Sequence, residues 1–373
     1  MKLVVKREPF MAALEAAAAI VPVRSVRPNL RNALLVASSD GQIEVHATDL
    51  EVGLRYKLKA ESVKDPASLC LPCGTLAGLL KECTEDVVTL DTEGSKGILK
   101  IGRDRFEILG QESSDFPEVP DLGEGATVKI PGEDLGLMID RTIFAAAREQ
   151  GRYAINGVFM QYKDKLLELV ATDGRRLAYC KKKLKAGGGL DDGVIVPIKM
   201  MQEIRKLCGR VGKEGTVDIA VRGRSVLVRG GPEEAQMTLS SLVVEGIFPK
   251  YQQVIPKDCE KEASFKRETI SQALRKAQYL TSDDTRTVNF TFSPGTVLIE
   301  ARSPDKGVAA VTVEVEYAGD KLQIAFNPQY VQEALKVLTE DNLRLEMKDG
   351  SRPGVLREGQ DFLYVLMPVS GKD

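Results

Sequence analysis

The feature that most constrains the fold of this 373-residue chain is an internal repeat. Three segments open with a short strand-like stretch that leads into an amphipathic helix, one from Lys2 to about Ile20, one from near residue 127 and one from near residue 263. In each helix the apolar residues recur with the 3.6-residue period of a helix that buries one face. Such self-similarity is typical of a chain built from copies of one structural unit.

A second strand-and-helix pair recurs later in each segment, with a proline near the start of the helix. These later strands are predicted at 69–72, 194–197 and 324–328. Alternating apolar stretches separated by turn residues lie between the helices and predict antiparallel hairpins. We therefore expect an α+β fold of three tandem copies of a two-helix, antiparallel-sheet domain. The expected domains, with joints after Phe116-Pro117 and Phe248-Pro249, are 1–122, 123–257 and 258–373.

The composition favours a cytoplasmic globular protein without a metal or cofactor. Hydrophobic residues make up 43% of the chain and charged residues 28%. No apolar run approaches the roughly 18 residues that a membrane span needs, and the stretch from Met1 to Lys6 lacks the apolar core of a signal peptide. The pair Cys70 and Cys73 has no second pair to complete a zinc site, and His46 is the only histidine. We expect reduced, structural thiols.

Motifs for catalysis are weak in this chain. The stretch 209–213, Gly-Arg-Val-Gly-Lys, lacks the spacing and the Ser or Thr of a phosphate-binding loop and follows a predicted helix. The sequence Thr48-Asp49 recurs as Thr172-Asp173, and an aspartate in such a place is expected to cap the N–H groups of a turn. A hydrolase that uses Asp173 stays open as an alternative, which the single histidine disfavours.

Basic residues gather on and after the predicted helices, although the net charge is −2. If these helices share one face, that face would attract duplex phosphates independently of base sequence. Tryptophan is absent and aromatic residues total 5%, so no stacking platform for single strands is indicated. A repeat scaffold that binds other proteins, with incidental basic helices, is the main alternative. The basic residues are Arg24, Arg27, Arg31, Arg141, Arg148, Arg152, Lys199, Arg205, Lys206, Arg210, Lys213, Arg275, Lys276 and Lys336.

A set of short motifs, in order along the whole chain, resembles the bacterial sliding clamp family, the β subunits of the replicative DNA polymerase. The motifs are 47–51, Asp115-Phe116-Pro117, 153–157, 170–178, 245–251, Phe326-Asn327 with Tyr330, and 364–368. The resemblance implies a non-catalytic homodimer, joined head to tail into a ring of six domains around double-stranded DNA. Such a ring would tether the replicative DNA polymerase, a clamp loader and repair proteins for processive synthesis.

The resemblance also implies which residues carry these roles. It implies an apolar pocket for short hydrophobic peptide motifs, formed by Ile155, Thr172, Gly174, Arg175, Arg176, Leu177, Pro249, Val254, Tyr330, Val365, Met367, Pro368 and Val369. It implies a dimer interface in which Phe106 and Ile108 meet Tyr279 and Leu280. The DNA-facing charges expected here are Arg24, Lys199 and Arg205.

Three places depart from the family pattern. Gln253 stands where a basic residue is familiar, Ser351 stands where an apolar residue is familiar, and the tail Ser370-Gly371-Lys372-Asp373 is additional. These departures leave the preferred peptide motif open.

Overall fold

The computed structural model describes residues 1–148, 153–185, 187–281 and 286–369. The chain divides into two compact units. Unit 1 comprises Met1–Gly136, Lys185–Asp191 and Lys199–Val243, and unit 2 comprises Leu137–Leu184, Asp192–Ile198 and the chain from Val244 onward. The additional tail, 370–373, and Arg152 lie outside the described residues.

Unit 1 contains two antiparallel sheets. The five-stranded sheet has the order β5 (Ser62–Lys64), β1 (Lys2–Lys6), β7 (Val87–Glu93), β8 (Lys96–Ile101) and β9 (Asp104–Leu109). The eight-stranded sheet has the order β10 (Val128–Pro131), β15 (Thr216–Arg222), β16 (Ser225–Gly230), β17 (Ala235–Leu242), β4 (Val52–Lys59), β3 (Gln42–Thr48), β2 (Ala33–Ala37) and β6 (Ser68–Leu71).

Unit 2 is built in a similar way. Its eight-stranded sheet has the order β14 (Val194–Pro197), β11 (Gly157–Lys163), β12 (Leu166–Thr172), β13 (Arg176–Lys183), β25 (Phe362–Leu366), β24 (Gly354–Glu358), β23 (Asn342–Met347) and β18 (Lys261–Lys266). Its four-stranded sheet has the order β21 (Gly307–Glu314), β20 (Thr296–Ser303), β19 (Val288–Ser293) and β22 (Leu322–Phe326).

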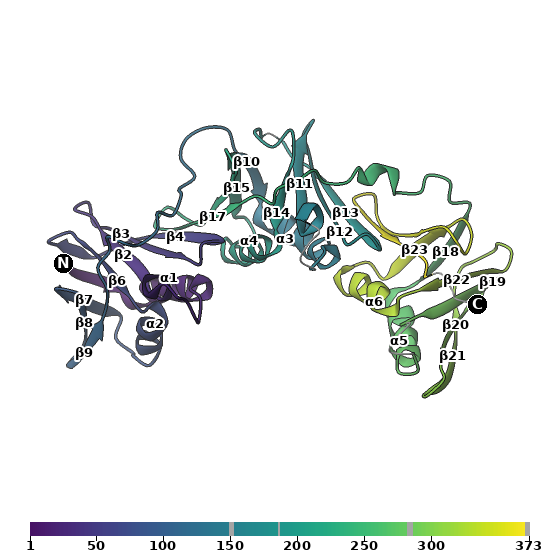
Figure 1. Ribbon diagram of the computed structural model, residues 1–373, viewed down its shortest axis with the longest axis horizontal. Coiled ribbons are helices and arrows are strands. Elements are labelled where there is room, and N and C mark those ends of the chain that lie inside the picture. The colour runs from purple at the N-terminus through teal and green to yellow at the C-terminus, as the bar shows by residue number, and fades with distance from the viewer. Residues whose placement is uncertain (149–152, 186, 282–285, 370–373) are drawn as a thin grey trace. The chain divides into compact units, whose positions relative to one another are not determined.

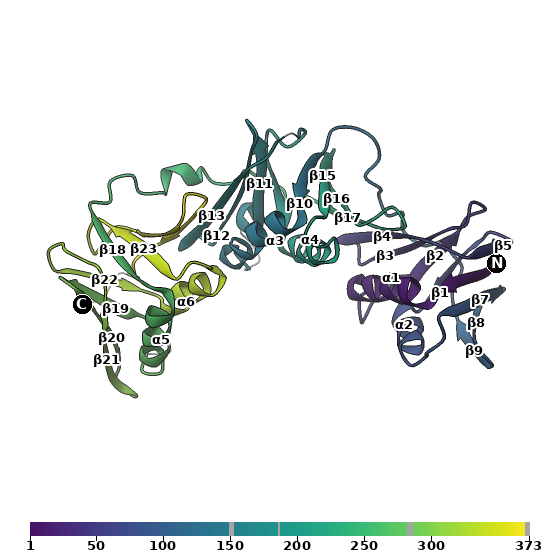
Figure 2. The same ribbon diagram turned by 180° about the vertical axis from the view of Figure 1, so that it is seen from behind.

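The predicted strand-to-helix repeat is confirmed, because each of the six α-helices in the described residues follows a strand closely. They are α1 (Arg7–Ile20), α2 (Cys73–Lys81), α3 (Gly132–Asp140), α4 (Ile198–Arg210), α5 (Arg267–Gln278) and α6 (Pro328–Val337). In unit 1, α1 packs against α2, and in unit 2, α5 packs against α6, as Figures 1 and 2 show. The small residues of α1, such as Ala13 and Ala17, are fully buried and allow this close packing.

Helices α3 and α4 are each followed by a separate turn or loop. Ile143 belongs to a separate 3₁₀ turn, Ile143–Ala145, because α3 ends at Asp140 and the Thr142 hydroxyl donates to the Met138 carbonyl at 2.8 Å. Helix α4 ends at Arg210, so Lys213 lies in the loop that follows it. The glycine-rich stretch 209–213 therefore comprises the last residues of α4 and the loop that follows it.

The Thr-Asp motif forms the same turn in both units. In unit 1, Asp49 Oδ1 accepts hydrogen bonds from the backbone N–H groups of Glu51 and Val52, at 3.0 and 2.9 Å. In unit 2, Asp173 Oδ1 accepts from Arg175 and Arg176, at 2.9 and 3.1 Å. These bonds confirm the turn-capping role that was predicted for the two aspartates.

The six cysteines are all free, as expected. Burial raises the pKa of Cys70, Cys73 and Cys180 to about 11, which keeps these thiols protonated and poorly nucleophilic at neutral pH. They act as small core side chains.

The turn at Asp49 leads to a stability prediction. Replacing Asp49 by alanine leaves two backbone donors without their acceptor, so we expect the free energy of unfolding to fall by about 2 kcal/mol. Asp49→Asn keeps an oxygen in the same place and should cost less than half as much. Urea unfolding followed by circular dichroism measures both variants. Equal losses for the two variants would show that the charge, rather than the turn geometry, is what matters.

Candidate functional site

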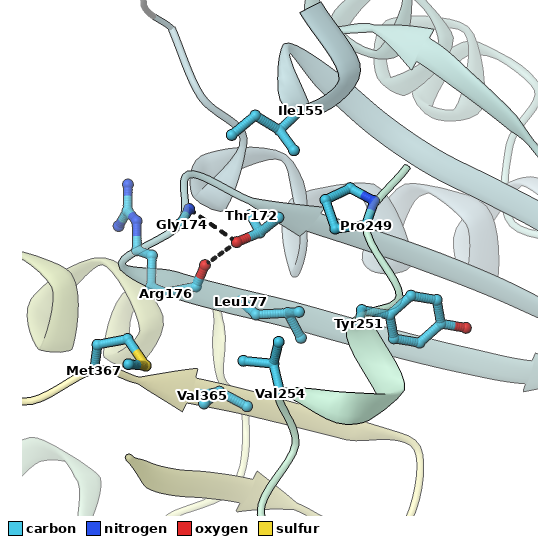
Figure 3. A pocket seen from close by; sticks show the side chains of 10 residues that line it. All are labelled: Ile155, Thr172, Gly174, Arg176, Leu177, Pro249, Tyr251, Val254, Val365 and Met367. Atoms are coloured by element: carbon cyan, nitrogen blue, oxygen red, sulfur yellow. Dashed lines mark hydrogen bonds between the residues drawn. The ribbon is translucent and has the colours of Figure 1, made fainter. Parts of the chain in front are cut away.

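An apolar pocket of about 140 Å³ lies in unit 2 (Figure 3). Its floor comes from β13 and β25, which pair so that Leu177 stands opposite Val365. In Figure 3 the side chains of Leu177, Val254 and Val365 point towards one another. The full lining is Ile155, Thr172, Gly174, Arg176, Leu177, Pro249, Tyr251, Val254, Val365 and Met367.

The turn before β13 shapes one rim of the pocket. The Thr172 hydroxyl donates to the Arg176 carbonyl at 2.6 Å and accepts from the Gly174 N–H at 3.1 Å, as the dashed lines of Figure 3 show. Gly174 has φ +86°, a left-handed conformation that glycine adopts without strain. The turn therefore keeps Thr172 and Leu177 at fixed places on the pocket wall.

The opposite wall is the segment after β17, which Tyr251 anchors. The ring of Tyr251 is 5% exposed and packs against Phe159, Phe248 and Tyr179. Its hydroxyl donates to Glu168 Oε2 at 3.2 Å, and the Tyr179 hydroxyl donates to the other oxygen of the same carboxylate. Burial and the adjacent carboxylate raise the pKa of both tyrosines above the usual value, so both stay protonated donors.

Arg176 joins the pocket to the neighbouring helix. Its guanidinium pairs with Asp173 Oδ2 at 3.0 Å and with Glu333 of α6, and it donates to the Phe144 carbonyl at 2.7 Å. The guanidinium also lies 4.3 Å from the centre of the Tyr330 ring, a cation–π distance. The side chain is 8% exposed, so these contacts are buried and hold the pocket wall in place against α6.

Nine of the thirteen predicted pocket residues lie in this lining. Among the other four, Tyr330 stacks on Arg176, while Arg175, Pro368 and Val369 stand outside the lining. Tyr251 lines the pocket although it was not among the predicted pocket residues. The sequence feature that could have indicated Tyr251 is the stretch 248–251, Phe-Pro-Lys-Tyr, in which an aromatic residue follows the expected domain joint at Phe248-Pro249.

The two departures in the described region have a structural setting. Gln253 ends the 3₁₀ turn Tyr251–Gln253 and is exposed, one residue before the pocket residue Val254. Ser351 is exposed in a turn where Asp349 Oδ1 accepts from its N–H at 2.8 Å and from its hydroxyl at 2.7 Å.

The residues expected to face DNA differ in their surroundings. Arg24 and Arg205 are exposed, whereas Lys199 is half-buried and pairs with Asp49 and, at 3.7 Å, with Glu51. Arg141, expected among the surface basic residues, is 9% exposed and pairs with the buried Glu358. Expecting a surface position for Arg141 was therefore wrong, because this ion pair is built into the core of unit 2.

The residues expected at a dimer interface also differ in exposure. Tyr279 is 82% exposed and Leu280 is half-buried. On β9, alternation turns Phe106 and Ile108 to the covered face, where Ile108 is 6% exposed. The adjacent side chain on the outer face, Leu109, is 75% exposed.

Within the described residues, no group of three or more Cys, His, Asp or Glu could hold a metal ion. None of the helices in those residues is long and apolar enough to cross a membrane. Asp173, the residue of the hydrolase alternative, is engaged with backbone N–H groups and with Arg176.

Comparison with known proteins agrees with this arrangement. Three family models match consecutive parts of the chain: the N-terminal domain of the DNA polymerase III beta subunit over residues 1–120, its central domain over 129–250 and its C-terminal domain over 252–370. The chain belongs to the DNA polymerase III beta subunit family, the beta sliding clamps.

Individual members of the family match over their full length. The beta sliding clamp of Pseudomonas putida is 30% identical over 372 residues, which cover 99% of this chain and 100% of that protein. The crystal structure of the Pseudomonas aeruginosa beta subunit matches with a TM-score of 0.91 at 30% identity, over 99% of both chains. A structure of the P. aeruginosa clamp bound to griselimycin matches with the same TM-score at 29% identity, over 100% of both chains.

The site leads to a prediction for Arg176. Lysine cannot donate to Asp173, Glu333 and the Phe144 carbonyl together, so Arg176→Lys should lower the free energy of unfolding by roughly 2 kcal/mol. The matched control is Arg175→Lys, a change at the exposed neighbour, which should be neutral within about 0.5 kcal/mol. Equal stability of the two variants in thermal unfolding would contradict the bracing role of Arg176.

Proposed function

We propose that this chain is a DNA sliding clamp, a non-catalytic subunit that encircles duplex DNA and tethers the replicative polymerase. The observation that carries the proposal is the match of all three beta-subunit domain models in order, with solved family members aligned over the whole chain. The domains of the proposed clamp are 1–122, 123–257 and 258–373. The proposed place of action is the cytoplasm, where bacterial DNA is replicated.

The proposed ring consists of two chains joined head to tail. Strand β9 ends one sheet of unit 1 and β21 ends one sheet of unit 2, so each has an edge with unpaired backbone groups. Both edges carry exposed aliphatic side chains, Leu109 at 75% and Val308 at 56%. Pairing of β9 with β21 of a second chain would satisfy the backbone groups and cover these side chains, and two such contacts would close a ring. Tyr279 and Leu280 would lie at the same seam.

Introducing a charged residue at the proposed β9–β21 interface tests the dimer proposal. Leu109→Glu would bury an unpaired carboxylate in the proposed interface, so light scattering at micromolar concentration should give a mass near 40.7 kDa instead of twice that value. The matched control is Val26→Glu, which changes a fully exposed aliphatic residue away from any strand and should keep the dimer mass. A Leu109→Glu dimer as tight as the parent would contradict this interface.

Contacts with DNA in the proposed ring are few and sequence-independent. Exposed basic residues such as Arg24 and Arg205 would attract phosphates at long range, and the attraction would weaken as salt rises. Lys199 is a weak candidate, because Asp49 and Glu51 already hold its ammonium group. Loose contacts of this kind suit sliding, since no base-specific bond has to break at each step.

The pocket of unit 2 is the proposed docking site for the polymerase, the clamp loader and repair proteins. Its walls are aliphatic and its volume suits one or two apolar side chains of a short peptide motif. Met367, 40% exposed at the rim, offers an adaptable contact for peptides of different shape. Exposed basic residues at the rim, Arg175 and Lys250, would favour motifs that also carry an acidic residue.

Filling the pocket tests this assignment. Val254 is 43% exposed and lines the cavity, so Val254→Arg would place a charged side chain where the peptide should sit. We expect primer extension by the cognate polymerase and loader to give products at least tenfold shorter, at an unchanged dimer mass. The matched control is Gln253→Arg, one residue away and outside this lining, which should support products of normal length. Normal products with Val254→Arg would contradict the docking role.

A further inference from the structure

Unit 1 contains a second cavity of about 140 Å³, at the place in its own sheet that corresponds to the pocket of unit 2. It lies where β4 pairs with β17, and its lining includes Thr48, Leu50, Glu51, Pro117, Ser240 and Leu242. No function described above uses this cavity.

The two cavities are built from matching parts. Each lies beside a Thr-Asp turn whose threonine hydroxyl donates to the carbonyl four residues later, from Thr48 to Val52 at 3.0 Å and from Thr172 to Arg176 at 2.6 Å. Each turn contains a residue with positive φ, Leu50 at +77° and Gly174 at +86°. The strand after each turn pairs with an antiparallel partner, so Ser240 stands opposite Gly53 as Val365 stands opposite Leu177.

A Phe-Pro joint completes both sites, with Pro117 in one lining and Pro249 in the other. At this end of the cavity in unit 1, Val119 is 1% exposed and packs over Gly53. A β-carbon at position 53 would lie 2.8 Å from the Val119 side chain and 2.5 Å from Ser240 Oγ. The chain's own valine therefore takes part of the apolar space, and any ligand must bind mainly through the polar groups that remain.

Those polar groups differ in chemistry from the pocket of unit 2. Ser225, Ser240 and Ser241 line the cavity in unit 1, and Ser240 is 4% exposed. The side chain of Ser240 borders the cavity, so its hydroxyl faces the space that a ligand would occupy. A buried hydroxyl of this kind is suited to bind a ligand's amide group.

The charges at the rim are reversed between the two sites. Glu51 occupies the turn position that Arg175 occupies in unit 2, and Glu118 follows Pro117 where Lys250 follows Pro249. The Glu51 side chain is 77% exposed, and Glu118 is exposed. Lys199 lies 3.7 Å from Glu51, but its closer ion pair is with the half-buried Asp49. The Glu51 carboxylate is therefore only partly neutralised, and the outer rim of the cavity stays acidic.

From this geometry we propose that the cavity of unit 1 is a second peptide-binding site, and that it selects a short extended segment of a partner protein with an arginine or lysine beside a small aliphatic residue. The basic side chain would pair with Glu51 and Glu118, and the segment's backbone would bind the serine hydroxyls. The exposed aliphatic side chains of Leu50 and Leu242 would contact the small residue. The two cavities of one chain would then select partners of opposite charge.

The test uses a fluorescein-labelled, N-acetylated and C-amidated peptide, Gly-Arg-Val-Arg-Gly, and its acidic twin, Gly-Glu-Val-Glu-Gly, with the full chain. We expect anisotropy titrations to show at least tenfold tighter binding of the basic peptide. The double variant Glu51→Arg/Glu118→Arg should lose this binding at least tenfold. The matched control, Glu82→Arg/Glu93→Arg, makes the same change of net charge at exposed residues outside the cavity and should bind like the parent.

The alternatives give different results. If the control variant loses binding as much as the cavity variant, the peptide responds to net charge alone and the proposed site is refuted. If the two peptides bind equally, or neither binds at millimolar chain concentration, the proposal is refuted as well. Val254→Arg, which fills the pocket of unit 2, should leave binding of the basic peptide unchanged, so this test is independent of the docking role proposed for that pocket.

Discussion

The antiparallel pairing of β13 with β25 in unit 2, and of β4 with β17 in unit 1, is the interaction on which the sites of this protein depend. Each ladder joins strands that lie far apart in the sequence, and its register decides which side chains meet at the end of the strands. A slip of one residue would turn Leu177 and Val365 to the opposite faces and remove the pocket floor. The Thr-Asp turns fix where β4 and β13 begin, and so they hold this register in place.

One backbone arrangement thus carries two kinds of surface. In unit 2 the ladder ends in aliphatic side chains with basic residues at the rim, whereas in unit 1 the matching positions hold serines and acidic residues. The backbone hydrogen bonds that form the ladders do not depend on side-chain identity, so the positions at its end could diverge without loss of the fold. Function in this chain therefore resides in a small number of side chains placed by a repeated framework.

The repeat, the strand-to-helix order and the two capping aspartates could be predicted because each is a local pattern of the sequence. The pocket could be located only through resemblance, since Leu177 and Val365 are 188 positions apart and no local pattern connects them. The same limit hid the Arg141–Glu358 and Lys199–Asp49 ion pairs, which turn apparent surface charges into structural ones. On β9, alternation alone could not tell which face is covered, and the structure shows Ile108 at 6% exposure and Leu109 at 75%.

The central claim, a closed ring that holds DNA by topology, is tested most directly by retention on DNA of different shape. The chain is loaded by its cognate ATP-driven loader onto nicked circular duplex DNA, and the complex is isolated by gel filtration at moderate salt. The account predicts that the protein stays with the circles and leaves within minutes after a single cut makes them linear, since a sliding ring runs off a free end. Retention that does not change on cutting, or loss from intact circles at the same rate, would contradict the account.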